Sequence, residues 1–291
     1  MVADPGRFAA AALGAMLVAL AGCGRPARPP AIDSVAVAAL PTLDHPATHD
    51  AIGGLHARNG FLVRSTLDFS ATSLRRVGWR DGVWLDQGPP WPDLDGTLAG
   101  GSRTSDGRYL RGWTTAESRL GAAWDLWIST VVGTDWSLPR PLASLNTAAM
   151  ECCVVGTESG WFYFASNRGG SWDVYRAPVV GDSAGPPERL GGSVNTPHDE
   201  WPSYADPAGR FLIHSSIRPD GRGLDDIYLS CRREDGWESG QLLGDDVNTP
   251  RFEDSAILSP DGRWLIFSRH GGPGGSAGAI RIASAALRAT C

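Results

Sequence analysis

The chain has 291 residues, of which 42% are hydrophobic, a size that suits one large domain or two small ones. Its 26 basic residues, all of them arginine, stand against 32 acidic residues and give a formal net charge of −6. This balance provides no broad basic field, so nucleic acid is not expected as the main partner.

The first 22 residues have the pattern of an export signal. Arg7 precedes an apolar run over 8–20, and the segment ends in Leu20-Ala21-Gly22-Cys23. This ending resembles the lipobox of bacterial lipoproteins, which implies cleavage before Cys23 and attachment of lipid to its thiol. An ordinary cleaved signal peptide with an incidental cysteine is the alternative. The proline-rich segment 23–33 then predicts an extended tether. We therefore expect an exported protein that contacts the membrane only through a lipid anchor, at the outer membrane or facing the periplasm.

Short strands separated by turn signals follow over 34–291. Five strongly apolar or aromatic strands begin at 61, 109, 161, 211 and 264, at intervals of 48, 52, 50 and 53 residues. Each follows a turn that contains glycine. Third strands are expected at Trp124, Trp172 and Asp225, and outer strands near Trp84, Trp136 and Trp237. A period near 50 residues with four strands is typical of a propeller blade. The sequence therefore predicts an all-β fold, a single propeller of five four-stranded blades.

The two ends of the domain predict how the ring closes. The last copy stops after its third strand, and 34–40 is a lone apolar segment ahead of the first copy. The stretch LDHPATHDA from Leu43 aligns with VNTPRFEDS from Val247. We expect the N-terminal strand to complete the C-terminal blade, because closure removes exposed sheet edges.

Two stretches carry a family resemblance, SPDGRWLIFSR from Ser259 and FYFASNRGGSWDVYRA from Phe162. They resemble the WD40-like (PD40) repeats of TolB-type propellers, and the resemblance covers 146 to the end. It implies a propeller that binds other molecules, in the case of TolB protein partners of the cell envelope. We expect a non-catalytic platform for an envelope protein or a small or carbohydrate ligand, and no cofactor. Propellers host many functions, so the resemblance does not imply one activity. A monomer is expected.

Three blocks that begin Asn-Thr mark the crossings between blades. A glutamate stands five residues after each asparagine, in the pairs Asn146 and Glu151, Asn195 and Glu200, and Asn248 and Glu253. The repeat places these glutamates at the start of the innermost strands, at one channel mouth. The candidate ligand-binding residues are His49, Asp50, Glu151, His198, Glu200 and Glu253. A ring of carboxylates can hold a cation or a polyhydroxyl ligand. Alternatively, repeated acidic and asparagine side chains hold turns by bonding local backbone.

A glycoside hydrolase is the enzymatic alternative. Similarity to five-bladed propeller glycosidases implies Asp50 as base, Asp95 as the residue that tunes the acid, and Glu151 as acid. Such hydrolysis needs two carboxyl groups about 5–9.5 Å apart. Stacking surfaces for sugar rings are expected at Trp91, Trp113 and Trp201. The chain contains no Gly-x-Ser-x-Gly nucleophile motif and no phosphate-binding glycine loop, and its six histidines lack metal-ligand spacing. No metal site is expected.

Four cysteines follow the lipobox: Cys152, Cys153, Cys231 and Cys291. An exported protein can form disulfides, and the sequence leaves the three possible pairings open. Because neighbouring residues of a strand point to opposite faces, Cys152 and Cys153 are not expected to bond each other.

Overall fold

The described residues belong to a computed structural model. They are 48–56, 59–66, 72–80, 83–88, 91, 98–103, 109–114, 124–132, 135–180, 183–192, 194–258, 264–270, 276–281 and 291. This part of the chain contains strands and turns and no helix, which confirms the all-β prediction. The described part of the chain therefore contains no helix that is long and apolar enough to cross a membrane. The predicted signal (1–22), Cys23 with its tether (23–33) and the predicted strand 34–40 lie outside the described residues.

The described strands form five antiparallel sheets, each made of strands that are consecutive in the sequence. The first sheet contains β1 (Thr48–His56), β2 (Asn59–Thr66), β3 (Thr72–Arg80) and β4 (Val83–Gly88). The second contains β5 (Leu98–Arg103), β6 (Tyr109–Thr114), β7 (Leu126–Val132), β8 (Asp135–Trp136) and β9 (Arg140–Pro141). The third contains β10 (Glu151–Gly156), β11 (Trp161–Ser166), β12 (Asp173–Val180), β13 (Ser183–Ala184) and β14 (Glu188–Arg189). The fourth contains β15 (Glu200–Ala205), β16 (Phe211–Ser216), β17 (Asp226–Arg233), β18 (Gly236–Trp237) and β19 (Gln241–Leu242). The fifth contains β20 (Phe252–Leu258), β21 (Trp264–His270) and β22 (Ser276–Arg281).

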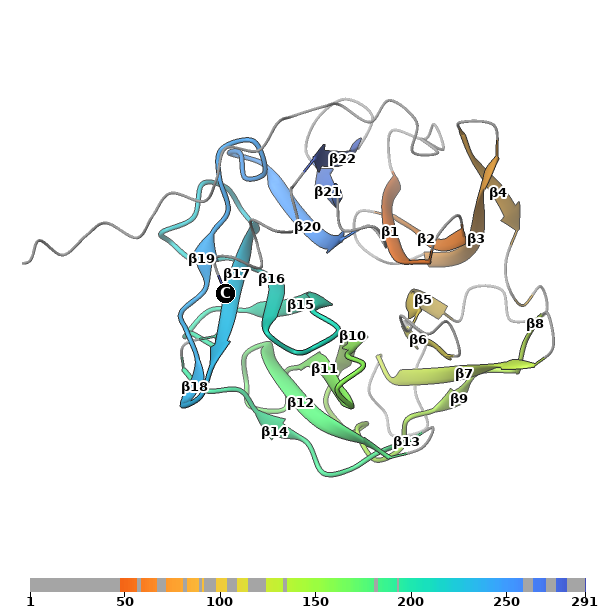
Figure 1. The fold of residues 1–291 in the computed structure, drawn as a ribbon, viewed down its shortest axis with the longest axis horizontal. Coiled ribbons are helices and arrows are strands. Elements are labelled where there is room, and N and C mark those ends of the chain that lie inside the picture. The colour runs from red at the N-terminus through yellow and green to blue at the C-terminus, as the bar shows by residue number, and fades with distance from the viewer. Residues whose placement is uncertain are drawn as a thin grey trace, which may run out of the picture.

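The sheets lie around a common centre, with the first strand of each sheet closest to it (Figure 1). We call these strands, β1, β5, β10, β15 and β20, the inner strands. Each inner strand contacts the next one along the chain, and β20 also contacts β1. The starts of the inner strands therefore come together around the centre.

The apolar core lies between neighbouring sheets, because strands such as β11 are covered on both faces. Phe162 and Phe164 pack with Leu126 and Ile128 of the second sheet. Tyr163, on the opposite face of β11, packs with Leu212 of the fourth sheet. The period-2 alternation thus supplies apolar side chains to two interfaces at once, as the aromatic run predicted.

Each inner strand contains a register shift against the second strand of its sheet. In β10 the shift lies between Cys152 and Val155, and in β20 between Asp254 and Ile257. Cys153 stands two residues after Glu151 and has a φ of 60°, and Ser255 stands two residues after Glu253 and has a φ of 54°. A bulge of this kind breaks the strict alternation of side chains between the two faces.

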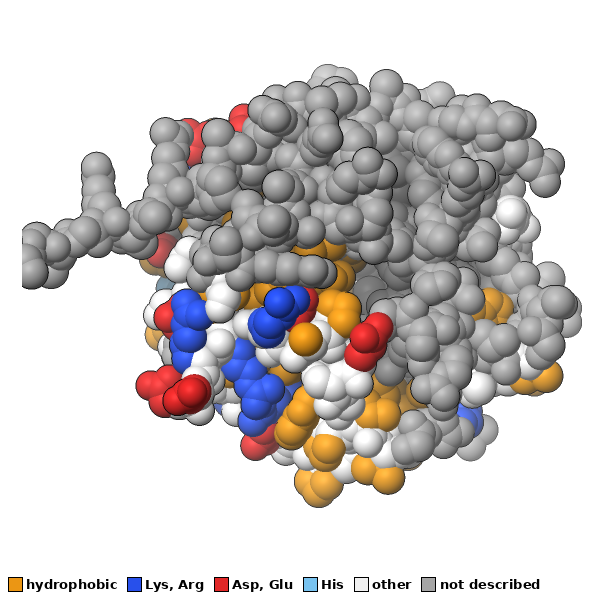
Figure 2. All heavy atoms as spheres, viewed as in Figure 1, with side chains coloured by type: hydrophobic (Ala, Val, Ile, Leu, Met, Phe, Trp, Pro, Cys, Tyr) orange, Lys and Arg blue, Asp and Glu red, His pale blue; other side chains and the backbone are white. Residues whose placement is uncertain are grey.

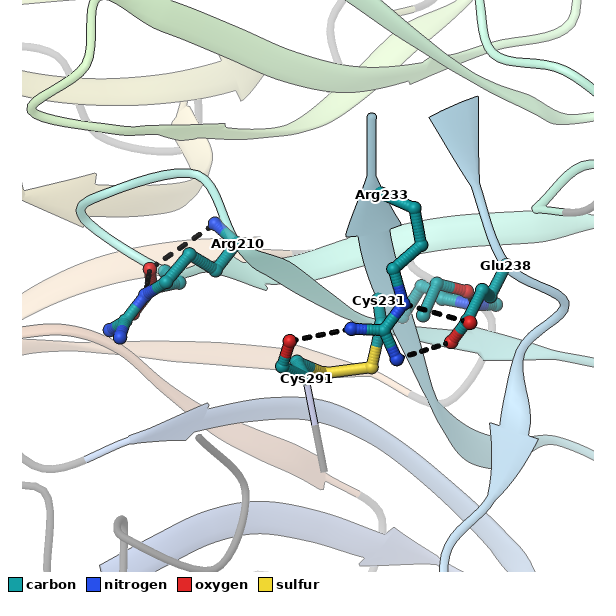
Figure 3. Close-up of a disulfide and its surroundings, with 8 residues drawn as sticks. Arg210, Cys231, Arg233, Glu238 and Cys291 are labelled. Carbon is teal, nitrogen blue, oxygen red and sulfur yellow. Dashed lines mark hydrogen bonds and ion pairs between the residues drawn. A yellow bond between two sulfur atoms is a disulfide. The ribbon is translucent and has the colours of Figure 1, made fainter. Parts of the chain in front are cut away.

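The bulge corrects the prediction that Cys152 and Cys153 point to opposite faces of their strand. Their Sγ atoms lie 2.7 Å apart, and both thiols are free. The premise was wrong because it assumed regular strand geometry at this position, whereas the prediction that the two cysteines are not bonded to each other is confirmed in this structure. The pairing that the sequence left open is Cys231 with Cys291, which joins the last residue of the chain to β17. Figure 3 shows Arg233 beside this disulfide, where it donates to the Cys291 carbonyl oxygen and to Glu238.

A candidate binding site at the start of the inner strands

The asparagine of each Asn-Thr block holds the third strand of the preceding sheet. The Asn195 side chain accepts from Val174 N at 2.7 Å and donates to Val174 O at 2.9 Å and to Leu190 O at 3.0 Å. Asn248 makes the same three bonds with Ile227 and Leu243. An amide can satisfy a strand end in this way because it offers both a donor and an acceptor.

The glutamate of each block accepts hydrogen bonds from its own turn. Glu151 accepts from Thr147 N at 3.0 Å, from Thr147 Oγ1 at 2.7 Å and from Ser166 Oγ at 2.8 Å. Glu200 repeats the pattern with Thr196 and Ser216. All three glutamates, including Glu253, are completely buried.

An arginine completes each network, and sequence reasoning did not single it out. Arg168 Nη2 lies 3.1 Å from Glu151 Oε1, Arg218 Nε 3.5 Å from Glu200 Oε1, and Arg269 Nε 2.7 Å from Glu253 Oε1. The same arginines donate to the carbonyl of the residue before the asparagine, which is Leu145, Val194 or Val247. We call each set of Asn, Thr, Glu and Arg a latch.

The latches place the predicted glutamates within the junctions between sheets. Each carboxylate faces the threonine and arginine of its own latch, and its charge is paired there. The geometry shows how the blocks connect one sheet to the next, which is the local bonding that the sequence left open as an alternative.

The other predicted mouth residues are described to different extents. His198 is half-buried, and its backbone N donates to Thr196 Oγ1 within the fourth-sheet turn. The structure describes only the backbone of His49 and Asp50, in β1. Asp95 lies outside the described residues. Within the described part of the chain, no three His, Cys, Asp or Glu side chains are grouped so as to hold a metal ion.

Three half-buried tryptophans form a continuous row across the second, third and fourth sheets. The ring centroids of Trp124 and Trp172 are 5.6 Å apart, and those of Trp172 and Trp201 are 6.4 Å apart. The row lies at the start of the inner strands, because Trp124 O and Trp172 O accept from Glu151 N and Glu200 N. Sequence reasoning named only Trp201 of these three as a stacking residue. Trp91, also named, is buried and donates through Nε1 to Ser137 O, while the side chain of Trp113 lies outside the description.

Two aspartates occupy the next positions of the same pattern. Asp225 is equivalent to Trp172, because its backbone O accepts from the N of the next latch glutamate, Glu253. Asp254 is equivalent to Trp201, because it directly follows its latch glutamate. Asp225 is 2% exposed, and its Oδ1 has no hydrogen-bond partner. Burial, and then the negative charge of Asp254, raise the pKa of Asp225 well above its ordinary value. The row of indoles is thus followed by a pair of neighbouring carboxyl groups.

Charges on the described surface are mixed. On the face shown in Figure 2, basic and acidic side chains are interspersed among hydrophobic ones over the described sheets. The described surface also carries exposed ion pairs, such as Arg233 with Glu238. This distribution agrees with the small net charge of the chain.

No family model matches the sequence, and no curated protein matches it. Among solved structures, the endo-arabinase from Bacteroides thetaiotaomicron has a TM-score of 0.55 at 16% identity, over 84% of this chain and 96% of that one. An alpha-L-arabinofuranosidase from Podospora anserina, in complex with cellotriose, has a TM-score of 0.53 at 10% identity, over 87% and 96%.

TolB from Acinetobacter baumannii has a TM-score of 0.46 at 12% identity, over 77% of this chain. The chain spans 52% of that TolB, and a likeness of this size carries no argument. At these identities, the first two likenesses show the fold alone. Together with the sheets arranged around a centre, they identify the described chain as a propeller-type all-β fold.

Proposed function

We propose that the chain is a five-bladed propeller, closed by the strand 34–40 and anchored to the bacterial envelope through lipid on Cys23. The five described sheets, the contact of β20 with β1, and the three described strands of the last sheet support this architecture. In this proposal the last sheet takes its missing outer strand from the N-terminus.

We further propose that the channel mouth is a non-catalytic binding platform for a carbohydrate of the envelope. The row formed by Trp124, Trp172 and Trp201 carries this proposal. Half-buried indoles offer planar apolar surfaces on which ring-shaped ligands pack. Asp254, which is half-buried, lies at the next position of the pattern and offers hydrogen-bonding groups to hydroxyls. His49, Asp50 and His198 belong to the same mouth, and the latch glutamates act on it by fixing the strand starts that present the indoles.

The glycosidase alternative receives no support from the geometry of Glu151. Its two oxygens already accept from Thr147, Ser166 and Arg168, and the side chain is completely buried. A general acid must reach the glycosidic oxygen of a bound substrate. The latch therefore argues against Glu151 as the general acid.

The test measures binding of the purified full-length protein to envelope polysaccharides by affinity electrophoresis and titration calorimetry. Trp172→Ala is expected to weaken binding at least tenfold. The matched control is Trp161→Ala, since Trp161 lies at the opposite end of its sheet, paired with Pro178, and should leave binding unchanged. Failure to bind any polysaccharide, or equal binding by both variants, would contradict the proposal. Release of sugars by the wild type that is lost in a Glu151→Gln variant shown by circular dichroism to be folded would establish the enzyme instead.

A further inference from the structure

The free thiols of Cys152 and Cys153 are in unusually close contact. Their Sγ atoms lie 2.7 Å apart, closer than two non-bonded sulfur atoms normally approach. A disulfide bond needs about 2.05 Å, so closure requires an approach of about 0.7 Å. Cys231 and Cys291 are already bonded to each other, so among the described cysteines these two thiols are each other's available partners.

The bulge of the inner strand explains why adjacent side chains meet here. The register shift follows Cys152, and Cys153 has a φ of 60°. Ser255 has the same place in β20, with a φ of 54°, and Ser203 lies at the register shift of β15. The backbone geometry at Cys153 is thus shared with the fifth sheet, and the third sheet places a cysteine where the fifth sheet has serine.

We propose that Cys152 and Cys153 are a vicinal dithiol site that is oxidised to an eight-membered disulfide ring by exchange with a disulfide-bearing oxidant. The site is independent of the ligand proposed for the channel mouth. Its ring contains the peptide bond between the two residues, both Cα and Cβ atoms, and the two sulfurs.

The exchange proceeds in two balanced steps. The partly exposed Cys153 attacks first as a thiolate, forms a mixed disulfide with one sulfur of the oxidant and releases the other as a thiol. Cys152 then loses its proton, attacks Sγ of Cys153 and releases the second thiol. Two electrons and two protons pass to the oxidant. Cys152 is suited to the second step by proximity, since its Sγ lies 2.7 Å from Sγ of Cys153. Burial, and then its contact with Cys153, raise the pKa of the Cys152 thiol well above the ordinary value, which is why Cys153 is the thiol that attacks the oxidant first.

The ring should be more easily reduced than the bond between Cys231 and Cys291. Most disulfides join residues whose Cα atoms are about 4.4–6.8 Å apart, whereas neighbouring residues are held at about 3.8 Å. Cys231 and Cys291, at 5.1 Å, lie within the usual range. Strained disulfides have the higher reduction potentials, so mild reductant should open the ring first. The reduced pair then presents two thiols to a thiophilic probe such as phenylarsine oxide.

Tryptic mapping tests the site, because the peptide 120–168 contains both cysteines and no other. Purified full-length protein is treated with oxidised glutathione, alkylated in urea without reductant, and digested. The peptide should be lighter than the dithiol by two hydrogen atoms and carry no alkyl group. After mild reduction it should bind one phenylarsine oxide, while Cys231 and Cys291 remain bonded.

Cys153→Ser is the matched control, since serine occupies the equivalent position in the bulge of β20, at Ser255. It should fold, as judged by circular dichroism and an intact bond between Cys231 and Cys291, and should form neither the ring nor the arsenical adduct. Cys152→Ser should behave in the same way and provides a second test if one variant fails to fold. The proposal is overturned if both wild-type cysteines are alkylated after oxidation, or if the variants bind the arsenical as the wild type does.

Discussion

Arg218 and Glu200 form a buried ion pair at the junction of the third and fourth sheets. Arg218 Nε lies 3.5 Å from Glu200 Oε1, and the two side chains are 7% and 0% exposed. In the other two latches the arginine is 20% or 23% exposed. The fourth-sheet latch is therefore the most fully desolvated, and its two charges depend most strongly on each other.

Replacing Glu200 by glutamine should lower the free energy of unfolding by about 3–5 kcal/mol, because it leaves the buried Arg218 without its counter-charge. Urea unfolding followed by tryptophan fluorescence measures the loss. Glu188→Gln is the control, since Glu188 pairs with Arg176 but is 54% exposed, and its removal should cost about 0–1 kcal/mol. Equal losses in the two variants would show that Glu200 is not a structural acid, and would return it to the list of ligand-binding candidates.

The sequence predicted the strands and the crossings because these depend on local patterns. Alternating apolar residues, glycine turns and the Asn-Thr blocks each act within a few residues of the chain. The latch arginines were not predicted, because their spacing from the preceding serine varies between the copies. Arg168 and Arg218 stand two residues after a serine, whereas Arg269 directly follows one.

The tryptophan row and the cysteine contact could not be predicted for a different reason. Trp172 and Trp201 are on different sheets, so their contact depends on how those sheets pack. The contact of Cys152 with Cys153 depends on a bulge that cannot be predicted from the residue types in the strand. Both features arise from geometry beyond the period of the repeat.

Stability should fall as the pH is lowered, in part because of His214. Burial, and then the positive charge of Arg218, lower the pKa of His214 to about 3. The unfolded histidine has a pKa of about 6.5, so between these values the unfolded chain binds a proton that the folded chain does not. His214 thus contributes stability above pH 6.5 that is lost as the pH falls towards 3.

The change His214→Gln tests this contribution. Between pH 7.5 and 5.0 the wild type should lose about 2 kcal/mol more than the variant, from the 1.4 kcal/mol that corresponds to each pKa unit. Urea unfolding at both pH values measures the difference. Glutamine retains a group that can bond Ser230, which lies 3.0 Å from His214 Nε2. Parallel losses in both proteins would contradict the prediction.

Asp225 should give the stability of the fold the opposite dependence on pH. Its pKa is raised, first by burial and then by Asp254, so above its ordinary pKa the folded chain retains a proton that the unfolded chain loses. The stability that this contributes at low pH is lost as the pH rises through the folded value. Asp225→Asn removes the titration and should stabilise the protein at pH 7, with a smaller gain at pH 4.

The control for this change is Asp235→Asn, in an exposed turn, which should alter stability by less than about 0.5 kcal/mol. Thermal or urea unfolding at pH 4 and pH 7 is the measurement. A stabilisation of Asp225→Asn that does not change with pH would show that the buried carboxyl does not titrate as described. A destabilisation at pH 7 would show that its charge is needed in the fold.

The disulfide between Cys231 and Cys291 encloses the whole fifth sheet, because β20, β21 and β22 all lie between its two ends. Replacing both cysteines by serine should lower the free energy of unfolding by about 2–4 kcal/mol, since a cross-link over 60 residues restricts the unfolded chain. Hydrogen exchange should also quicken in β20–β22 more than in β10–β12, because the fifth sheet loses its covalent attachment to β17.

Arg233→Met is the companion variant: it removes the bond to the Cys291 carbonyl oxygen but keeps the disulfide, and should leave exchange in the fifth sheet nearly unchanged. Uniformly faster exchange in all sheets of the double-serine variant would mean that the bond supports the fold as a whole and does not secure its last sheet in particular.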